Sequence, residues 1–281
     1  MKISDWLRQA KATLTESGCP DPEIDARWMA EDVLGMTRVD LKFESEREVS
    51  PSQLNRLNDM LSRRADGEPV QYILERADFM GLKFHVDKRV LIPRQDTETL
   101  AEQALIALTP MGEADALDLC TGSGCVGLSL KSLAPLARVT LTDISKDALE
   151  VAKLNAGELG LDVTLRCGDL FHAVENQRFD LIASNPPYIP HADLESLQPE
   201  VQHEPMLALD GGTDGLEIYR RIAQDAPRYL KPGGELLLEV GIGEAQAVQA
   251  LLKINLNCAD TGIVKDLNGI ERVVWAKLKA C

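Results

Sequence analysis

The sequence has few of the features that indicate a metal site, a disulfide framework or a membrane span. Its 281 residues include six cysteines and four histidines, and neither type clusters at C-x-x-C or metal-ligand spacing. We therefore expect reduced cysteines and no metal. No apolar run approaches the length of a bilayer span, and the first residues lack the apolar core of a signal peptide. The sequence predicts a cytoplasmic protein without membrane association.

Positive charge is also scarce. Lysine and arginine number 30 against 45 aspartates and glutamates, which gives a formal net charge of −15. Binding to DNA depends largely on neutralising phosphates with basic side chains, so an acidic chain without a basic tail is a poor candidate for an enzyme of duplex DNA. The charge balance favours a protein substrate, or a basic ribonucleoprotein, over DNA.

Residues 1–75 predict a small helical domain. Apolar residues recur at helical spacing in three stretches that are separated by turn residues. None of these stretches carries a pattern typical of catalysis, so we expect a domain that recognises the substrate. The residues expected to begin or end its helices are Ser4, Gly35, Ser50, Pro51, Gln53 and Gly67.

The rest of the chain predicts an α/β domain. Residues 76–93 alternate around Gly81 and indicate a β-hairpin that links the two domains. From residue 94 onward, apolar strands alternate with helices, the first of which Asp96 or Thr97 is expected to cap. This alternation predicts a mostly parallel sheet with helices on both faces. The expected strands lie at 116–119, 139–143, 163–166, 179–183, 235–240 after a turn at 231–234, and in an antiparallel edge pair at 263–264 and 273–275.

A glycine-rich turn and two later acids form the first candidate site. The turn joins a strand to a helix, where glycine lets the backbone approach a ligand and helix N–H groups point at it. Asp143 ends the next strand and can hold two ribose hydroxyls, while Asp169 and Leu170 follow the third strand and can bracket an adenine. This set suits S-adenosylmethionine (SAM). The candidate cofactor residues are Cys120, Thr121, Gly122, Ser123, Gly124, Asp143, Asp169, Leu170 and Asn185.

The same glycines permit a second interpretation. Gly122-x-Gly124-x-x-Gly127 matches the dinucleotide fingerprint, and Asp143 follows at about the spacing of a ribose ligand. A nicotinamide enzyme more often carries this pattern near its start, and it has no need of the tetrapeptide described next. The glycine pattern alone does not separate the two classes.

The second candidate site is Asn185-Pro186-Pro187-Tyr188, directly after the expected strand 179–183. Open α/β sheets bind their ligands at the carboxyl ends of strands. Two prolines make a rigid turn whose carbonyls can accept hydrogen bonds. Asn185 adds a side-chain carbonyl, and Tyr188 adds a flat aromatic face. The tetrapeptide predicts a site that accepts both hydrogens of a planar NH2 group, such as an amide or an exocyclic amine.

With these motifs, the sequence resembles the peptide chain release factor glutamine N5-methyltransferases, the HemK family of SAM-dependent methyltransferases. The resemblance covers nearly the whole chain. It departs from the family pattern at Gln95, where proline is frequent, and at Glu75 and Cys120, where glycine is usual. The matching motifs lie at 67–73, 90–94, 96–98, 120–124, 185–188, 204–205 and 210–216.

The resemblance implies a class I methyltransferase fold, which is Rossmann-like with a mostly parallel seven-stranded sheet. It implies a methyltransferase domain at 94–281, with the helical domain and the hairpin linker before it. The implied reaction is methyl transfer from SAM to the glutamine of the Gly-Gly-Gln motif in release factors, by a monomeric enzyme.

The resemblance also implies roles for individual residues. Residues 120–124 correspond to the cradle for the methionine part of SAM, Asp143 to the ribose ligand, and Asp169 with Leu170 to the adenine site. Residues 185–188 correspond to the site for the glutamine, with Asn185, Pro186 and Tyr188 as the catalytic residues and Pro187 as a further substrate contact. The alternatives are a glutamine methyltransferase of a large-subunit ribosomal protein, an adenine-N6 nucleic-acid methyltransferase, and a non-catalytic SAM- or nucleotide-binding module.

Overall fold

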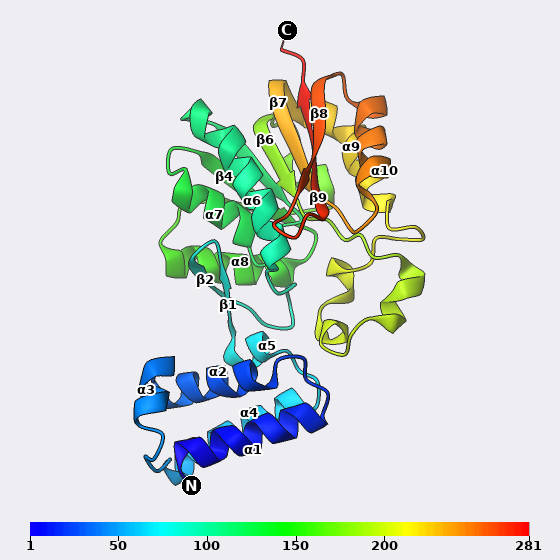
Figure 1. Cartoon of the computed structure of the whole chain (residues 1–281). Helices are drawn as coiled ribbons and strands as arrows, with labels where there is room; N and C mark the ends of the chain where they lie inside the picture. The colour runs from blue at the N-terminus through cyan, green and yellow to red at the C-terminus, as the bar shows by residue number, and fades with distance from the viewer. Residues whose placement is uncertain (281) are drawn as a thin grey trace. The chain divides into compact units, whose positions relative to one another are not determined.

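The computed structural model describes residues 1–280 and divides into two compact units, each of which is described by itself (Figure 1). The first unit comprises residues 1–76 together with the short segment 198–203. The second comprises residues 77–197 and the described residues from 204 onward. The division falls inside strand β1 (Arg76–Phe79), after Arg76, so the other residues of the hairpin that was expected as a linker belong to the second unit. Among residues 1–280, no helix combines the length and apolar character needed to cross a bilayer.

The first unit is helical. Its core includes Trp6, Met29 and Leu57, which are fully buried. The buried guanidinium of Arg64 pairs with Asp25 (2.7 Å) and with Glu200 (2.8 Å), and the second pair ties the segment 198–203 to this unit. Its helices are α1 (Ile3–Glu16), α2 (Pro22–Leu34), α3 (Arg38–Phe43), α4 (Pro51–Ala65) and α5 (Val70–Leu74), with the 3-10 turn η4 (Val201–His203) in the later segment.

Of the four expected helix ends, two are correct, one is wrong, and Gly67 lies one residue beyond Asp66, the C-cap of α4. Ser50 and Gln53 form the expected capping box of α4, in which each side chain accepts a hydrogen bond from the other residue's backbone N–H. Helix α2 ends at Gly35, whose φ of 65° is left-handed. Helix α1, however, begins at Ile3 after Lys2, so Ser4 already lies inside it and does not cap it. The sequence analysis did not anticipate α3 and α5, which are too short to show a periodic apolar pattern.

The second unit contains the expected seven-stranded sheet, in the order β5-β4-β3-β6-β7-β9-β8. Strands β3 to β7 pair in parallel, whereas β9 is antiparallel to both β7 and β8, which confirms the antiparallel pair at the edge. Strands β1 (Arg76–Phe79) and β2 (Leu82–His85) form a separate hairpin. The strands of the sheet are β3 (Asp115–Leu119), β4 (Arg138–Asp143), β5 (Thr164–Cys167), β6 (Phe179–Ser184), β7 (Leu230–Glu239), β8 (Cys258–Lys265) and β9 (Glu271–Leu278).

Residues 231–234, expected as a turn before a strand, instead form an irregular part of β7. The register pairs Phe179 with Leu230 and then Leu181 with Glu235, so the extra residues bulge out of the ladder. Lys231 lies in this bulge and bridges Asp115 (2.7 Å) and Asp180 (2.6 Å). These two aspartates lie at the amino ends of β3 and β6, so the bridge joins three neighbouring strands at that edge.

Helices cover both faces of the sheet. Figure 1 shows α6 (Gln95–Leu108), α7 (Cys125–Leu133) and α8 (Lys146–Leu159) on one face, and α9 (Glu217–Tyr229) and α10 (Ala245–Asn255) on the other. Helix α6 begins one residue before Asp96, and Arg94 occupies its cap position without a side-chain hydrogen bond. The expectation that Asp96 or Thr97 caps this helix is therefore wrong, and both side chains make other contacts. The remaining 3-10 turns are η1 (Thr109–Met111), η2 (Leu170–Val174), η3 (His191–Ser196) and η5 (Met206–Ala208).

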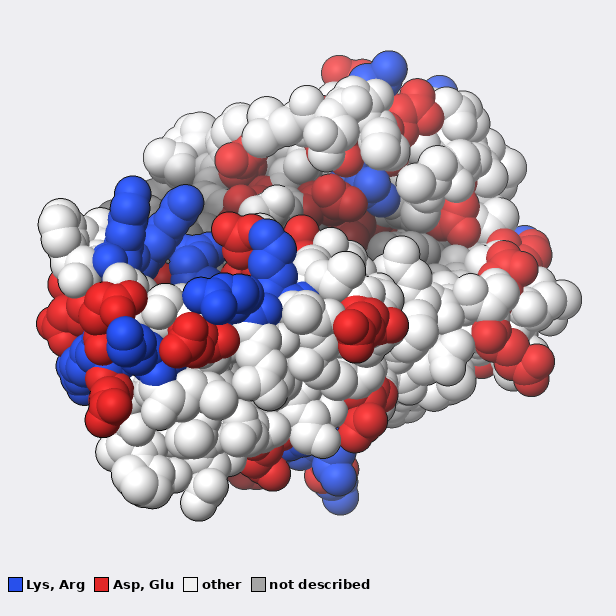
Figure 2. All heavy atoms as spheres, turned by 60° about the horizontal axis from the view of Figure 1, so that its bottom comes forward, with Lys and Arg blue, Asp and Glu red and all other residues white. Residues whose placement is uncertain are grey.

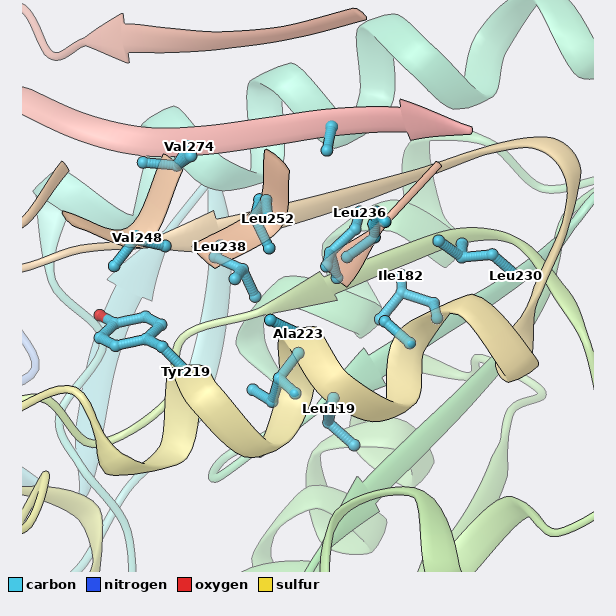
Figure 3. Packing of buried hydrophobic residues seen from close by; sticks show 14 of the residues in the cluster. Leu119, Ile182, Tyr219, Ala223, Leu230, Leu236, Leu238, Val248, Leu252 and Val274 are labelled. Carbon is cyan, nitrogen blue, oxygen red and sulfur yellow. The ribbon is translucent and has the colours of Figure 1, made fainter. Parts of the chain in front are cut away.

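The larger core lies between the sheet and the helices α9 and α10. Figure 3 shows Tyr219 and Ala223 of α9 packed against Leu236 and Leu238 of β7, with Val248 of α10 beside them. Side chains alternate along a strand, so the odd-numbered residues from 235 to 239 point to the opposite face, which α6 covers. This alternation places the side chain of Glu239, the last residue of β7, on the face that α6 covers.

Acidic and basic side chains are mixed on the surface. On the face in Figure 2, lysine and arginine side chains gather mainly toward the left, and aspartate and glutamate side chains lie among them. Ion pairs such as Lys2–Glu46 (2.7 Å) and Lys11–Glu23 (2.5 Å) are typical of this mixing. Exposed pairs of this kind contribute little to stability, about 0–1 kcal/mol each.

The backbone at Glu75 generates a prediction about stability. This exposed residue ends α5 with a φ of 52°, a left-handed conformation that its Cβ disfavours. Replacing Glu75 with glycine should raise the free energy of unfolding by up to about 1 kcal/mol, measured by thermal or urea denaturation. Glu75→Ala keeps the Cβ and serves as the control, for which we expect no such gain. A glycine variant no more stable than the alanine variant would contradict this account.

Candidate active site

A cavity of about 230 Å³ opens in the second unit where four parallel strands end. Asp143 is the last residue of β4, and Asn185 directly follows β6. The expected site residues that line the cavity are Cys120, Thr121, Gly122, Ser123, Asp143, Asp169, Leu170, Asn185 and Pro187. Of the remaining expected residues, Gly124 forms the N-cap of α7, Pro186 is buried, and Tyr188 is half-buried, and none of these three lines the cavity.

The turn after β3 keeps the conformation of a glycine-rich loop although its first residue is cysteine. Cys120 has a φ of 63°, Gly122 of 54° and Gly124 of 84°. Cysteine thus occupies a left-handed position that glycine would adopt without strain. Burial raises the pKa of the Cys120 thiol, which stays protonated and acts as a small apolar group against the core of Figure 3.

The buried side chain of Asp118 holds this turn by hydrogen bonds to both of its ends. Its Oδ2 atom accepts hydrogen bonds from the Thr121 hydroxyl (2.6 Å) and from the Gly127 backbone N–H (2.8 Å), so one carboxyl spans the whole turn. Burial raises the pKa of Asp118 to about 7. A Cβ on Gly127 would lie 2.0 Å from Leu141, so only glycine lets α7 approach the sheet this closely.

Asp143 and Ser123 offer polar atoms to a ligand. The carboxylate of Asp143 accepts hydrogen bonds from the backbone N–H groups of Gly122 and Ser145, both at 2.9 Å, which fixes its orientation. Each oxygen keeps lone-pair capacity for a hydroxyl donor. Burial raises the pKa of Asp143. The Ser123 hydroxyl is buried in the cavity wall and has no hydrogen-bond partner. A fixed carboxylate and an unpaired hydroxyl on one wall fit a nucleoside with a polar tail.

Asp169 is held by a residue that the sequence analysis missed. Arg221 of α9 pairs with it (2.6 Å), and both residues line the cavity. Leu170, the next residue, adopts a φ of 46° at the start of η2. The ion pair with Arg221 holds Asp169 at the cavity wall. The left-handed backbone of Leu170 is a strained conformation of the kind found at ligand sites.

Asn185 is the polar residue of the tetrapeptide that faces the cavity. Its Nδ2 atom donates a hydrogen bond to the hydroxyl of Thr97 on α6 (3.2 Å). Thr97 is almost fully buried, so it forms a fixed partner for this amide. With Nδ2 engaged in this way, Oδ1 is available as an acceptor.

The side chain of Tyr188, unlike that of Asn185, does not line the cavity. It packs against the core of Figure 3, and burial raises its pKa to about 12. The glycine loop 210–216 lies on its backbone. A Cβ on Gly211 would be 2.6 Å from the Tyr188 Cα, and one on Gly215 would be 2.5 Å from the Tyr188 carbonyl oxygen. The backbone N–H of Gly211 also donates to the carbonyl of Ile189 (2.8 Å). The late glycine loop therefore clamps the tetrapeptide.

Other motifs that lie far apart in the sequence are also direct partners. The carboxyl of Glu204 is almost fully buried, pairs with the Arg94 guanidinium and accepts a hydrogen bond from the Ile92 backbone N–H (3.0 Å). Asp96 pairs with Arg272 of β9 (2.9 Å). These contacts fix the first turn of α6 and the segment before it, which together form one wall of the cavity.

The sequence analysis missed several residues of this site. Arg94 stood in a quoted motif, but nothing indicated that it lines the cavity. Glu239 ends β7 beside Asn185, Arg272 of β9 acts electrostatically on Glu239, and no local sequence pattern marks either residue. The lining residues without an expected role include Arg89, Arg94, Ile144, Ile218 and Arg221. Among residues 1–280, no group of three or more His, Cys, Asp or Glu side chains could hold a metal ion.

Solved structures with a similar fold are methyltransferases. A methyltransferase from Pyrococcus furiosus matches 71% of this chain and 90% of its own, with a TM-score of 0.52 and 19% identity. The T. thermophilus 16S rRNA N2 G1207 methyltransferase, solved in complex with AdoMet and guanosine, matches 73% of this chain and 50% of its own, with a TM-score of 0.54 and 20% identity. At this identity the likeness shows the fold alone.

Sequence comparisons define the family. Residues 5–74 match the profile of the PrmC N-terminal domain, and residues 97–204 match that of the methyltransferase small domain. The release factor glutamine methyltransferase of Geobacter sulfurreducens is 44% identical over 99% of this chain and 96% of its own length. That of Caulobacter vibrioides is 42% identical over 97% of this chain and 94% of its own length. The chain belongs to the family of release factor glutamine methyltransferases.

Proposed function

We propose that this enzyme transfers a methyl group from SAM to the side-chain amide nitrogen of the glutamine in the Gly-Gly-Gln motif of peptide chain release factors. The observation that carries the proposal is the placement of Asn185, an amide with a free acceptor oxygen on the same cavity as the glycine turn and Asp143. The names of the full-length relatives support the substrate and do not favour a ribosomal protein or a nucleic-acid base. Because release factors act on ribosomes, we place the reaction in the cytoplasm.

The cavity wall fits the cofactor. We assign the ribose hydroxyls to Asp143, the methionine part to residues 120–123, and the adenine to Asp169 with Leu170. The unpaired Ser123 hydroxyl and the backbone-fixed Asp143 carboxylate support this assignment. When bound, SAM supplies an electrophilic methyl group on a sulfonium centre.

The tetrapeptide prepares the substrate amide. An amide nitrogen is a poor nucleophile because its lone pair is delocalised into the carbonyl. We assign the two N–H hydrogens of the glutamine to Asn185 Oδ1 and to the Pro186 carbonyl, which then orient the nitrogen and draw electron density toward it. Holding reacting groups in this way can lower a barrier by about 7–11 kcal/mol. Since the half-buried Tyr188 packs against the core, we assign it the role of anchoring this turn.

Methyl transfer from labelled SAM tests the function directly. The acceptors are a purified bacterial-type release factor and a copy whose Gly-Gly-Gln glutamine is replaced by alanine, with ribosomal protein and DNA in parallel. We expect label in the intact release factor alone. Label in ribosomal protein or DNA, or in the alanine copy, would refute the substrate assignment.

Two substitutions should separate substrate positioning from cofactor binding. Asn185→Ala should lower kcat by about a hundredfold or more and leave SAM affinity unchanged, because it removes an acceptor for the glutamine. Asp143→Ala should weaken SAM binding by about 1.5–3 kcal/mol through lost hydrogen bonds to the ribose. Calorimetry and steady-state kinetics measure the two effects. Equal loss of SAM affinity in both variants would contradict this division of roles.

The glycine clamp yields a further prediction. A methyl group at residue 211 would overlap the Tyr188 backbone, so Gly211→Ala should displace the tetrapeptide and lower kcat by about tenfold or more. SAM affinity should be retained, because residue 211 does not line the cavity. Gly157→Ala in α8 is the matched control, since a Cβ there meets nothing within 4 Å. Normal kcat in Gly211→Ala would show that the clamp does not position Asn185.

A further inference from the structure

Glu239 is a buried carboxyl to which the proposed reaction gives no role. It ends β7, is 1% exposed, and its Oε2 atom has no hydrogen-bond partner. Burying a carboxyl without full hydrogen bonding destabilises a fold, so a purely structural site would favour an apolar residue or a neutral amide. The cost of this residue indicates a function.

The strand register brings Glu239 beside Asn185. Leu238 of β7 pairs with Ser184, the last residue of β6, so Glu239 and Asn185, which follow this pair, lie at the same edge of the sheet. Strand alternation turns Glu239 toward α6, the helix that carries Thr97. The Thr97 hydroxyl, the charge of Arg272 and the Asn185 amide all act to stabilise the carboxylate form of Glu239. Glu239 is therefore part of the cluster that holds the Asn185 amide.

We propose that Glu239 is a positioning residue, whose carboxylate fixes the direction of hydrogen bonding from the Asn185 amide through the Thr97 hydroxyl and thereby turns Asn185 Oδ1 toward the substrate amide. This inference rests on the proposed function, because it concerns the acceptor that holds the glutamine. It assigns a role to Thr97, the central residue of the Asp96-Thr97-Glu98 motif.

The direction follows from the chemistry of the groups. In the proposed arrangement the carboxylate of Glu239, which can only accept, takes the single hydrogen of the Thr97 hydroxyl. The Thr97 oxygen then has only lone pairs to offer Asn185, which must present Nδ2 to it, as observed at 3.2 Å. Asn185 Oδ1 is left for the cavity. A protonated or amide side chain at residue 239 could donate to Thr97, and the hydroxyl could then donate to Oδ1 and turn the amide the wrong way.

The charge state of Glu239 gives this arrangement a pH dependence. Burial and the nearby charge of Asp96 raise its pKa to about 7, although Thr97, Arg272 and Asn185 act to lower it. Arg272 is itself paired with Asp96 (2.9 Å) and with Asp266 (3.3 Å). The other titratable groups that feel its charge are Tyr188, Tyr219 and Cys125, whose pKa values are all raised, so they stay neutral near pH 7. Protonation of Glu239 below pH 7 should therefore lower kcat.

Ionisation of Glu239 lowers the stability of the folded state as the pH rises, whereas ionisation of a salt-bridged acid raises it. The folded-state pKa of Glu239 lies above its ordinary value of 4.5, so the folded state binds the proton more tightly than the unfolded state. The cost of the buried charge is absent below the unfolded pKa and grows as the pH rises toward 7. Glu239→Gln removes this cost, so the variant should melt at the same temperature as the wild type or higher at neutral pH.

The experiment compares Glu239→Gln and Thr97→Val with the wild type. Glu239→Gln should lower kcat for the release factor by about ten- to a hundredfold, leave SAM affinity unchanged, and reduce the fall in kcat below pH 7. Thr97→Val should lower kcat by a similar factor. The double variant should lose no more activity than either single variant, because both substitutions interrupt the same series of hydrogen bonds. Thr97→Ser, which keeps the hydroxyl, should restore most of the rate.

Glu235→Gln is the matched control. Glu235 lies on the same strand and face but pairs with Lys277 (2.6 Å) at a distance from Asn185, so its variant should keep kcat and the pH profile of the wild type. Wild-type kcat and pH profile in Glu239→Gln would overturn the inference. A loss of melting temperature or SAM affinity that accompanies the loss of rate would also overturn it, because Glu239 would then be structural. No transfer by the wild-type protein would overturn the proposed function itself, and this inference with it.

Discussion

The active site depends on the common direction of the four parallel strands β5, β4, β3 and β6. Parallel pairing forces the carboxyl ends of these strands to one edge of the sheet, and each end carries a short polar segment. The glycine turn, Asp143, Asp169 and Asn185 meet there although up to 65 residues separate the first from the last. Every later feature of the site serves to hold these four segments in place.

The motifs that mark the family are largely each other's partners. Glu204 binds Arg94, the glycine loop covers the backbone of Tyr188, and Thr97 binds the amide of Asn185. Each pair joins two segments that the sheet alone would leave free to move. The family motifs therefore describe one network of contacts around the tetrapeptide, and only part of that network touches the cavity.

The sequence predicts the sheet well because its strands are short apolar runs whose pattern is local. The positions of the glycine turn, Asp143 and Asn185 are equally accessible, since each follows directly from a strand end. The expected starts of α1 and α6 were wrong, because good capping residues lie inside both helices. In α6, tertiary contacts with Arg272 and Asn185 use the side chains of Asp96 and Thr97 instead. Glu239 and Arg272 could not be found, since only strand register brings them to the site.

The Lys231 bridge lies at the opposite edge of the sheet. It joins β3, β6 and β7 at their amino ends, whereas the chemistry occurs at their carboxyl ends. Changes in this ionic cluster alter how firmly the strands are held together without altering any group that meets a substrate. Substitutions in this cluster can therefore change the rigidity of the enzyme at one edge of the sheet while the groups at the other edge keep their places.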